Sequence, residues 1–213
     1  MYDLLMRLPL FSWLLFVVTV QLTYLIHSTQ IDVYRRSSSI VHIAMQLSTI
    51  AFMMLMAAAV VMRTRPSGKA SGLEPRISAL VGTFLVYGIT AFPRRDLALS
   101  LEIISTLLIM VGNTGAIVAL SQLGRSFSIM AETRQLVTTG PYRFVRHPLY
   151  FAEEIAMVGV FMQFASVWTA LLLAMQIAFQ LRRMHNEELV LAARFPEYAA
   201  YRRNTARLIP GIY

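Results

Sequence analysis

A short basic segment bounded by prolines interrupts this otherwise apolar chain at residues 140–150, GPYRFVRHPLY. The segment places Arg143, Arg146 and His147 within five residues, directly before Pro148. Proline is common at the first position of a helix, where its missing N–H is not needed, so Pro148 predicts a helix start. Free backbone N–H groups and the helix dipole favour anions at such a start. We therefore expect Arg146 and His147 to lie where a negatively charged group can bind.

The apolar region that follows, residues 150–181, predicts a helical hairpin. It is too long for one straight membrane span of about 20 residues, and residues 163–166 form a polar break within it. The two ends of a hairpin are neighbours, so His147 before the first helix should face Glu187 and Glu188 at the end of the second. Ionisable residues at this depth are candidates for function. The alternative is an interfacial salt bridge that only holds the hairpin together.

The composition indicates an all-α integral membrane protein. Of 213 residues, 57% are hydrophobic and 14% are charged, with a mean hydropathy of +0.59, whereas soluble domains carry about 25% charged residues. An apolar run of about 20 residues can cross a bilayer as a helix. Such runs lie at residues 8–26, 40–62, 77–92 and 97–120. Together with the hairpin they predict about six membrane helices.

The distribution of basic residues predicts the orientation in the membrane. With six membrane helices, all but four of the 19 Lys and Arg residues fall on one side, together with both termini and residues 140–150. The four exceptions are Arg35, Arg36, Arg94 and Arg95. Basic residues are enriched in cytoplasmic loops, so we expect a multi-pass protein of a bacterial cytoplasmic membrane with both termini in the cytoplasm. The net charge of +8 is spread over short loops, which suits anionic lipids and argues against a nucleic-acid partner.

Polar residues concentrate in the C-terminal half, which predicts two parts. Residues 1–120 would be N-terminal transmembrane helices, and residues 121–213 a catalytic region made of the loop, the hairpin and the tail. No cysteine is present, which excludes disulfides and Cys nucleophiles. His185 and Glu188 have the helix spacing of half a metal site, but no histidine cluster accompanies them, so we expect no metal. Residues 64–76, with several Pro, Gly and Ser, predict a flexible cytoplasmic connector.

Two motifs occur in order along the second part. They are GPYRFVRHPLY at residues 140–150 and, after the hairpin, NEELVLAARFPEYAAYRRNTARLIP at residues 186–210. Together they resemble the isoprenylcysteine carboxyl methyltransferases and related phospholipid methyltransferases, whose pattern is G-x-Y-x-x-x-R-H-P-x-Y, an apolar hairpin, E-E-x-x-L and a closing Arg-hydrophobic-Ile-Pro. The resemblance is collinear across roughly residues 121–210. One departure is Pro196 after Phe195, where the family has glycine.

The resemblance implies S-adenosylmethionine as a methyl donor bound at the cytoplasmic face. The residues that match the motif, and are implied to bind this cofactor, are Tyr142, Arg146, His147, Pro148, Tyr150, Glu187 and Glu188. The carboxylate of the donor needs a cationic side chain or a helix start, and its ammonium group and ribose hydroxyls suit carboxylates. The candidate catalytic residues are Arg146, which could hold the donor or orient an acceptor, and Glu153 and Glu154, which could help to deprotonate an amine acceptor.

The implied acceptor is a lipophilic molecule that enters from the membrane, either a prenylcysteine-like carboxylate or a phospholipid amine. The expected partners are therefore this substrate and the surrounding lipids. Two other functions remain open. Sterol reductases resemble the C-terminal region and would use NADPH, which needs more basic residues for its additional phosphates. A protein that keeps the fold could also serve as a membrane scaffold or sensor without catalysis.

Overall fold

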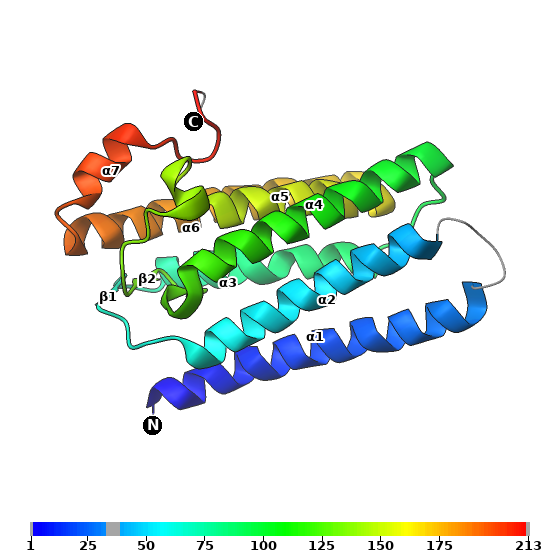
Figure 1. Cartoon of the computed structure of the whole chain (residues 1–213), viewed down its shortest axis with the longest axis horizontal. Helices are drawn as coiled ribbons and strands as arrows, with labels where there is room; N and C mark the ends of the chain where they lie inside the picture. The colour runs from blue at the N-terminus through cyan, green and yellow to red at the C-terminus, as the bar shows by residue number, and fades with distance from the viewer. Residues whose placement is uncertain (1, 33–38, 212–213) are drawn as a thin grey trace.

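The computed structural model describes residues 2–32 and 39–211 as an assembly of long helices that lie side by side (Figure 1). In chain order the elements are α1 (Tyr2–Asp32), α2 (Ser39–Met62), β1 (Gly68–Lys69), α3 (Glu74–Phe84), the 3-10 helix η1 (Leu85–Ala91), α4 (Leu99–Leu123), η2 (Gly124–Ser126), β2 (Glu132–Thr133), η3 (Gly140–Arg143), α5 (Pro148–Phe164), α6 (Val167–Arg194) and α7 (Tyr198–Asn204). The long helices alternate in direction, so the ends of α2, α4 and α6 lie beside the starts of α1, α3 and α5 (Figure 1).

Three of the described helices are long and apolar enough to cross a bilayer, which makes the chain a helical membrane protein. Their apolar segments are Leu8–His27, His42–Met62 and Leu99–Ser126. They coincide with the first, second and fourth apolar runs predicted from the sequence. The third run is divided, because α3 ends at Phe84 and the chain continues as the 3-10 helix η1. The total of six membrane helices and their orientation stay predictions.

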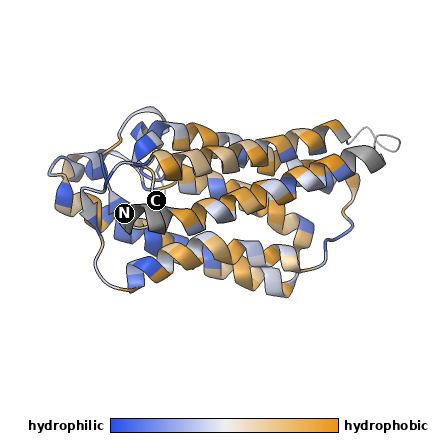
Figure 2. Ribbon diagram, turned by 90° about the horizontal axis from the view of Figure 1, so that it is seen from below, coloured by the Kyte–Doolittle hydropathy of each residue, from blue (hydrophilic) through white to orange (hydrophobic). Residues whose placement is uncertain are grey.

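Hydrophilic residues gather at the end of the molecule that carries β1, β2 and α7 (Figures 1 and 2). The Thr64 N–H donates to the Arg125 carbonyl at 3.0 Å, and the Arg125 side chain donates to the Met62 carbonyl at 3.1 Å. β1 and β2 then pair antiparallel. Residues 64–76 therefore differ from the free connector predicted for them, because part of their backbone is bonded to the segment after α4. These two short strands are also the exception to the expected all-α fold.

Of the four basic residues predicted to lie apart from the others, Arg94 and Arg95 are found at the end of the molecule away from β1, β2 and α7. Arg94 and Arg95 follow η1 and precede α4. The Arg95 N–H donates to the Gln163 carbonyl at 2.8 Å, which ties this connection to the end of α5. Arg35 and Arg36 lie outside the described residues. The predicted grouping of basic residues at one end thus agrees with the fold for the residues that are described.

α4 and α5 approach each other closely at two glycines. A Cβ atom on Gly112 would lie 2.4 Å from the Ala156 nitrogen and 2.6 Å from the Ala152 carbonyl oxygen. One on Gly159 would lie 2.6 Å from the Ser105 carbonyl oxygen, and the Ser105 hydroxyl donates to the Gly159 carbonyl at 3.0 Å. Small residues at such contacts are how helices pack in lipid. This contact fixes α5, and therefore the loop before it, against the bundle.

We expect Gly112→Ala to destabilise the protein by about 1–3 kcal/mol, because the added methyl group overpacks the contact and α5 must move away. The matched change Gly88→Ala should be close to neutral, since its nearest neighbour would be Leu172 Cδ1 at 3.7 Å. Thermal unfolding of both variants in one detergent measures the difference. Equal midpoints for Gly112→Ala and the wild type would contradict the close approach of the two helices.

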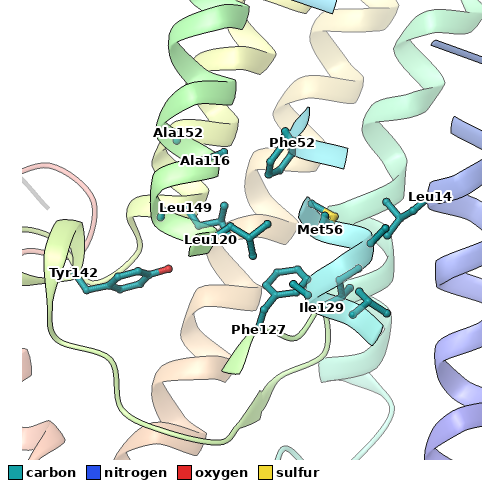
Figure 3. Close-up of a cluster of buried hydrophobic side chains, with 14 residues drawn as sticks. Leu14, Phe52, Met56, Ala116, Leu120, Phe127, Ile129, Tyr142, Leu149 and Ala152 are labelled. Atoms are coloured by element: carbon teal, nitrogen blue, oxygen red, sulfur yellow. The ribbon is translucent and has the colours of Figure 1, made fainter. Parts of the chain in front are cut away.

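A buried apolar core connects the membrane helices with the loop before α5 (Figure 3). It includes Leu14 of α1, Phe52 of α2 and Leu120 of α4, together with Phe127 and Tyr142 from the chain between α4 and α5. Figure 3 shows the ring of Tyr142 directed from its loop toward Leu120. Burial of such a side chain contributes roughly 1.5–3 kcal/mol. The core therefore anchors the basic loop to the ends of the helices.

Candidate active site

α5 and α6 form the predicted hairpin, with the turn at the polar break. Ser166 and Thr169 form a capping box at the start of α6, in which the Ser166 hydroxyl accepts from the Thr169 N–H at 3.1 Å. Four polar contacts then connect the two helices. From the open end toward the turn they are His147 with Glu188 at 3.0 Å, Tyr150 with Glu187, Glu153 with Gln180 at 3.0 Å and Glu154 with Gln176 at 2.9 Å. The predicted meeting of His147 with the glutamates of the second helix is therefore observed.

Glu188 joins the open end of the hairpin to the loop and the tail. Its Oε1 atom lies 3.0 Å from Arg146 Nε, 3.0 Å from His147 Nε2 and 3.2 Å from Arg207 Nε, and its side chain is 6% exposed. Burial by itself would raise the pKa of Glu188, but the hydrogen bonds from His147 and Arg146 and the charge of Arg207 lower it to about 2. Glu188 is therefore ionised at neutral pH and holds three basic side chains together.

Arg146 connects the loop to the C-terminal tail. Its Nη1 atom donates to the Arg202 carbonyl at 3.0 Å and to the Thr205 carbonyl, while its Nε atom donates to Glu188. Its backbone N–H donates to the Ala206 carbonyl at 2.8 Å. These contacts give Arg146 a positioning role for the tail. Its roles in cofactor binding and catalysis stay predictions.

A cavity lined about equally by polar and apolar groups lies between the basic loop, the open end of the hairpin and α7. We call it the polar cavity, because it is much more polar than the second cavity, which lies inside the helix bundle. Five of the residues predicted to bind the cofactor line it: Tyr142, Arg146, His147, Tyr150 and Glu187. The other two lie behind this wall. Pro148 is the first residue of α5, as expected, and Glu188 contacts Arg146 and His147 from the far side of the loop. The structure thus brings the predicted residues together, five at the wall and two that support it.

Four residues that line this cavity each carry a buried polar atom with no hydrogen-bond partner within the described parts of the chain. These atoms are Tyr142 Oη, Tyr198 Oη, Thr133 Oγ1 and Arg134 Nη1. Buried polar groups in proteins normally have a partner, so their presence indicates a polar ligand. The set fits S-adenosylmethionine: the hydroxyl and guanidinium groups can donate to its carboxylate, Glu187 can accept from its ammonium group or ribose, and the tyrosine rings can pack against adenine.

α7 contributes two tyrosines to the cavity wall, Tyr198 and Tyr201. The Tyr201 hydroxyl donates to the Tyr142 carbonyl at 2.5 Å, and the rings of Tyr198 and Tyr201 contact each other edge to face with centroids 5.9 Å apart. Burial raises the pKa of Tyr201 to about 12, so its hydroxyl keeps its proton and remains a donor. The tail therefore depends on the basic loop through a side chain as well as through the backbone.

Arg183 is a central residue of the site that the sequence did not single out. Its Nε lies 3.3 Å from Glu187 Oε1, and its guanidinium carbon lies 4.8 Å from the ring centroid of Tyr150. Its Nη1 donates to the Thr83 hydroxyl at 3.1 Å, and its Nη2 donates to the Ser128 carbonyl at 3.4 Å. The side chain is 5% exposed. Arg183 thus connects α3, α5, α6 and the chain after α4.

The signal that could have revealed Arg183 is a spacing within the hairpin. Polar residues recur on α6 at intervals of four, three and four: Gln176, Gln180, Arg183 and Glu187. Residues three and four apart lie on one face of a helix. A polar stripe on an otherwise apolar helix predicts a buried polar site. Counting Arg183 only as a basic residue that sets membrane orientation concealed this pattern.

A second cavity, of about 230 Å³, lies within the helix bundle and is mostly apolar. Its walls come from α1, α2, α3, η1, α4, α5 and α6, and they include Glu153, Gln176 and Gln180. Glu154 is not part of this wall and instead accepts from Gln176. Phe127 lines both cavities, so they lie next to each other at this residue. The predicted catalytic residue Glu153 therefore lies in the apolar cavity, apart from the residues predicted to bind the cofactor.

The fold and the site together define a helical membrane protein whose hairpin and tail enclose a polar cavity directly beside an apolar one. Residues 104–193 match the sequence profile of the isoprenylcysteine carboxyl methyltransferase (ICMT) family. The family that the two motifs resembled is thereby confirmed for this segment, which contains α5, nearly all of α6 and most of α4.

Two curated relatives are similar to one half of the chain. The nickel-cobalt-cadmium resistance protein NccN of Alcaligenes xylosoxydans xylosoxydans is 33% identical over 112 residues, and the cobalt-zinc-cadmium resistance protein CzcN of Cupriavidus metallidurans is 32% identical over 112 residues. Each alignment covers 50% of this chain, and 52% and 51% of the respective relative. The chain thus spans about half the length of the curated relatives it matches.

Proposed function

We propose that the protein transfers a methyl group from S-adenosylmethionine to a lipophilic acceptor at the cytoplasmic face of the membrane. The observation that carries this proposal is the pair of adjoining cavities, one polar and one apolar, which share Phe127. A water-soluble donor and a lipid-soluble acceptor arrive from different phases, so an enzyme that joins them needs two such cavities in contact. The family match of residues 104–193 supports methyl transfer as the type of reaction.

The residues that would hold the methyl donor are those of the polar cavity. Glu187 accepts from the Tyr150 hydroxyl and is paired with Arg183, so its carboxylate is held in one place. The ring of His147 stacks on that of Tyr150, with centroids 5.5 Å apart, and its Nε2 is tied to Glu188. When bound, the donor supplies a methyl group on a positively charged sulfur, which becomes a neutral thioether once the methyl group has left.

The chain contributes mainly position and exclusion of water. Methyl transfer from a sulfonium needs the two reactants in line and close together, so fixed walls lower its barrier. Phe127, which lines both cavities, is 3% exposed, and Tyr150 on the polar side is 5% exposed. A carboxylate acceptor needs no base, whereas an amine acceptor must first lose a proton. Glu153 is the carboxylate on the apolar side that can take this proton.

The test is calorimetric binding of S-adenosylmethionine and, separately, of NADPH to the detergent-purified protein. We expect micromolar binding of the methyl donor that weakens by about 10- to 100-fold in His147→Ala, because a buried hydrogen bond to a charged group is lost and the loop loosens. His185→Ala is the matched control, since His185 is exposed on α6. Binding of NADPH alone would instead indicate a reductase. Binding of neither molecule would favour a membrane protein without catalysis.

A further inference from the structure

The apolar cavity has a polar rim that contains two unusual glutamines. Gln176 and Gln180 of α6 are 3% and 2% exposed and line the cavity. The Gln180 Nε2 donates to Glu153 at 3.0 Å, and the Gln176 Nε2 donates to Glu154 at 2.9 Å. Among the described residues, neither amide oxygen has a hydrogen-bond partner. The rim therefore offers acceptors that the protein itself leaves unused.

The orientation of these amides follows from their partners. Each glutamine turns its NH₂ group toward its glutamate and its oxygen away, which is the orientation that an ionised carboxylate requires because it can only accept. Exchanging the nitrogen and oxygen of either amide would place two acceptors against each other. Leaving a buried acceptor unsatisfied costs about 1–3 kcal/mol. Two such oxygens on one wall of a cavity are therefore best explained by a ligand that donates to them.

The charges at the rim favour a cation. Within the described residues, neither Glu153 nor Glu154 has a basic side chain within 4 Å. Arg183, which also lines the cavity, is paired with Glu187 and donates to the Thr83 hydroxyl. On this wall Glu153 thus faces a single cation, Arg183, that is already paired with another carboxylate, and Glu154 lies behind Gln176.

Most other polar groups on the same wall already have acceptors; among the described residues the exceptions are the Trp13 indole N–H and Arg183 Nε, and the latter faces Glu187 at 3.3 Å. The Thr83 hydroxyl donates to the Ala79 carbonyl at 2.7 Å, and the Tyr87 hydroxyl donates to Met53 Sδ at 3.8 Å. The Nη2 group of Arg183 donates to the Ser128 carbonyl. A ligand that is itself only an acceptor, such as a carboxylate, would find few donors here and would face negative charge.

We propose that this cavity binds a lipophilic amine, with its apolar chain among the membrane helices and its protonated amino group at Glu153, Gln176 and Gln180. An ammonium group carries a positive charge and donates up to three hydrogen bonds, which matches two amide oxygens and a carboxylate. The inference rests on the proposed function, in which this amine is the substrate to be methylated. Glu153 would first hold the ammonium group and then take the proton that the nitrogen must lose before it can accept a methyl group.

The same amino head could belong to a single-chain amine or to an aminophospholipid, and binding experiments can separate the two. Trp13 lines the cavity, while the other tryptophan of the chain, Trp168, is 66% exposed. The variant Trp168→Phe therefore leaves Trp13 as the only tryptophan and as a reporter inside the cavity. Its fluorescence would be recorded in phosphatidylcholine nanodiscs during titration with dodecylamine or dodecanoate, which differ only in the head group. A second set of nanodiscs would contain phosphatidylethanolamine.

We expect saturable binding of dodecylamine at least about tenfold tighter than that of dodecanoate. In the same background, Glu153→Gln and Gln180→Leu should each weaken dodecylamine binding by about tenfold. Gln122→Leu, at an exposed glutamine, is the control and should bind like the parent. Glu153→Gln keeps the side-chain shape, so it tests the idea even if Gln180→Leu fails to fold. A Trp13 response to phosphatidylethanolamine would assign the phospholipid as the source of the amine, and its absence would assign the single-chain ligand.

Equal binding of the two probes, or tighter binding of dodecanoate, would overturn the inference. So would unchanged amine binding in both rim variants, because uptake into the nanodisc lipid alone gives that result. The assay contains no methyl donor, so it separates this inference from the proposed function. Failure of S-adenosylmethionine to bind would refute the methyltransferase and leave the amine site standing, whereas a preference for the carboxylate would refute only the amine.

Discussion

Glu188→Ala should abolish binding of the methyl donor and lower the thermal stability of the protein, while insertion into the membrane is retained. The side chain of Glu188 is almost fully buried, and its one oxygen Oε1 lies within 3.2 Å of Arg146, His147 and Arg207. Its removal leaves these basic groups close together without their shared counter-charge. Loss of one partner from a buried ion pair costs about 3–5 kcal/mol. The loop and the tail would then separate, and the polar cavity between them would open.

The expected size of this effect is large enough to measure directly. A loss of about 3–5 kcal/mol corresponds to a fall in the unfolding midpoint of roughly 6–20 °C for a chain of this size. Donor affinity should fall by about 100-fold or more, because the cavity wall is built on Arg146 and His147. Calorimetry with S-adenosylmethionine and thermal unfolding in the same detergent give both values. The control is Glu197→Ala, a change at an exposed glutamate of the turn before α7.

Glu188→Gln separates charge from shape at the same position. The amide oxygen of glutamine can still accept a hydrogen bond from one basic neighbour. The amide carries no negative charge, however, so it cannot balance the charges of Arg146, His147 and Arg207. We expect it to retain the fold better than alanine and still to bind the donor weakly. Donor binding at the wild-type level in both variants would show that the tail and the loop do not depend on Glu188, and the assignment of the polar cavity would have to be abandoned.

The sequence predicted the hairpin and its open end because those features are local or follow from short connections. Pro148 begins α5, and the turn falls at the polar break after Phe164. His147 then meets Glu188 because a hairpin places its first and last residues side by side. The resemblance supplied the residues of the cavity wall, since the motif itself contains Tyr142, Tyr150 and Glu187. These parts required no knowledge of how the other helices pack.

What the sequence could not supply depends on contacts between distant segments. Phe127 carries no motif, and only the packing of α1, α2 and α4 places its ring between the two cavities. Thr133 and Arg134 line the polar cavity because β2 pairs with β1. The two residues of β1 lie within residues 64–76, which the sequence predicted to be a connector. The apolar cavity is formed by helices from all parts of the chain. Its amine-binding rim becomes visible only when the partners of Gln176 and Gln180 are known.

Arg183→Met should be nearly as damaging as the loss of Glu188, although the replacement is apolar and similar in length. Arg183 is buried on the wall of the apolar cavity, where it pairs with Glu187, packs over Tyr150 and donates to Ser128 of the chain after α4. Without its cation, the partly buried Glu187 carboxylate keeps the hydrogen bond from Tyr150 but loses its counter-charge. We expect a loss of about 3–5 kcal/mol of stability, and a loss of methyl transfer that exceeds the loss of donor affinity, since Arg183 lines the apolar cavity and reaches the polar one only through its contacts with Glu187 and Tyr150.

The neighbouring residue provides a matched control in which the same chemical change is made at an exposed position of the helix. Arg182 is 55% exposed at its side chain and pairs with Glu74, which is 49% exposed. An exposed ion pair of this kind contributes about 0–1 kcal/mol, so Arg182→Met should leave the unfolding midpoint and donor binding almost unchanged. Equal effects of the two variants would mean that positive charge at this end of α6, and not the contacts of Arg183, supports the site. A stable, active Arg183→Met variant would show that the two cavities do not depend on the residue that joins their walls.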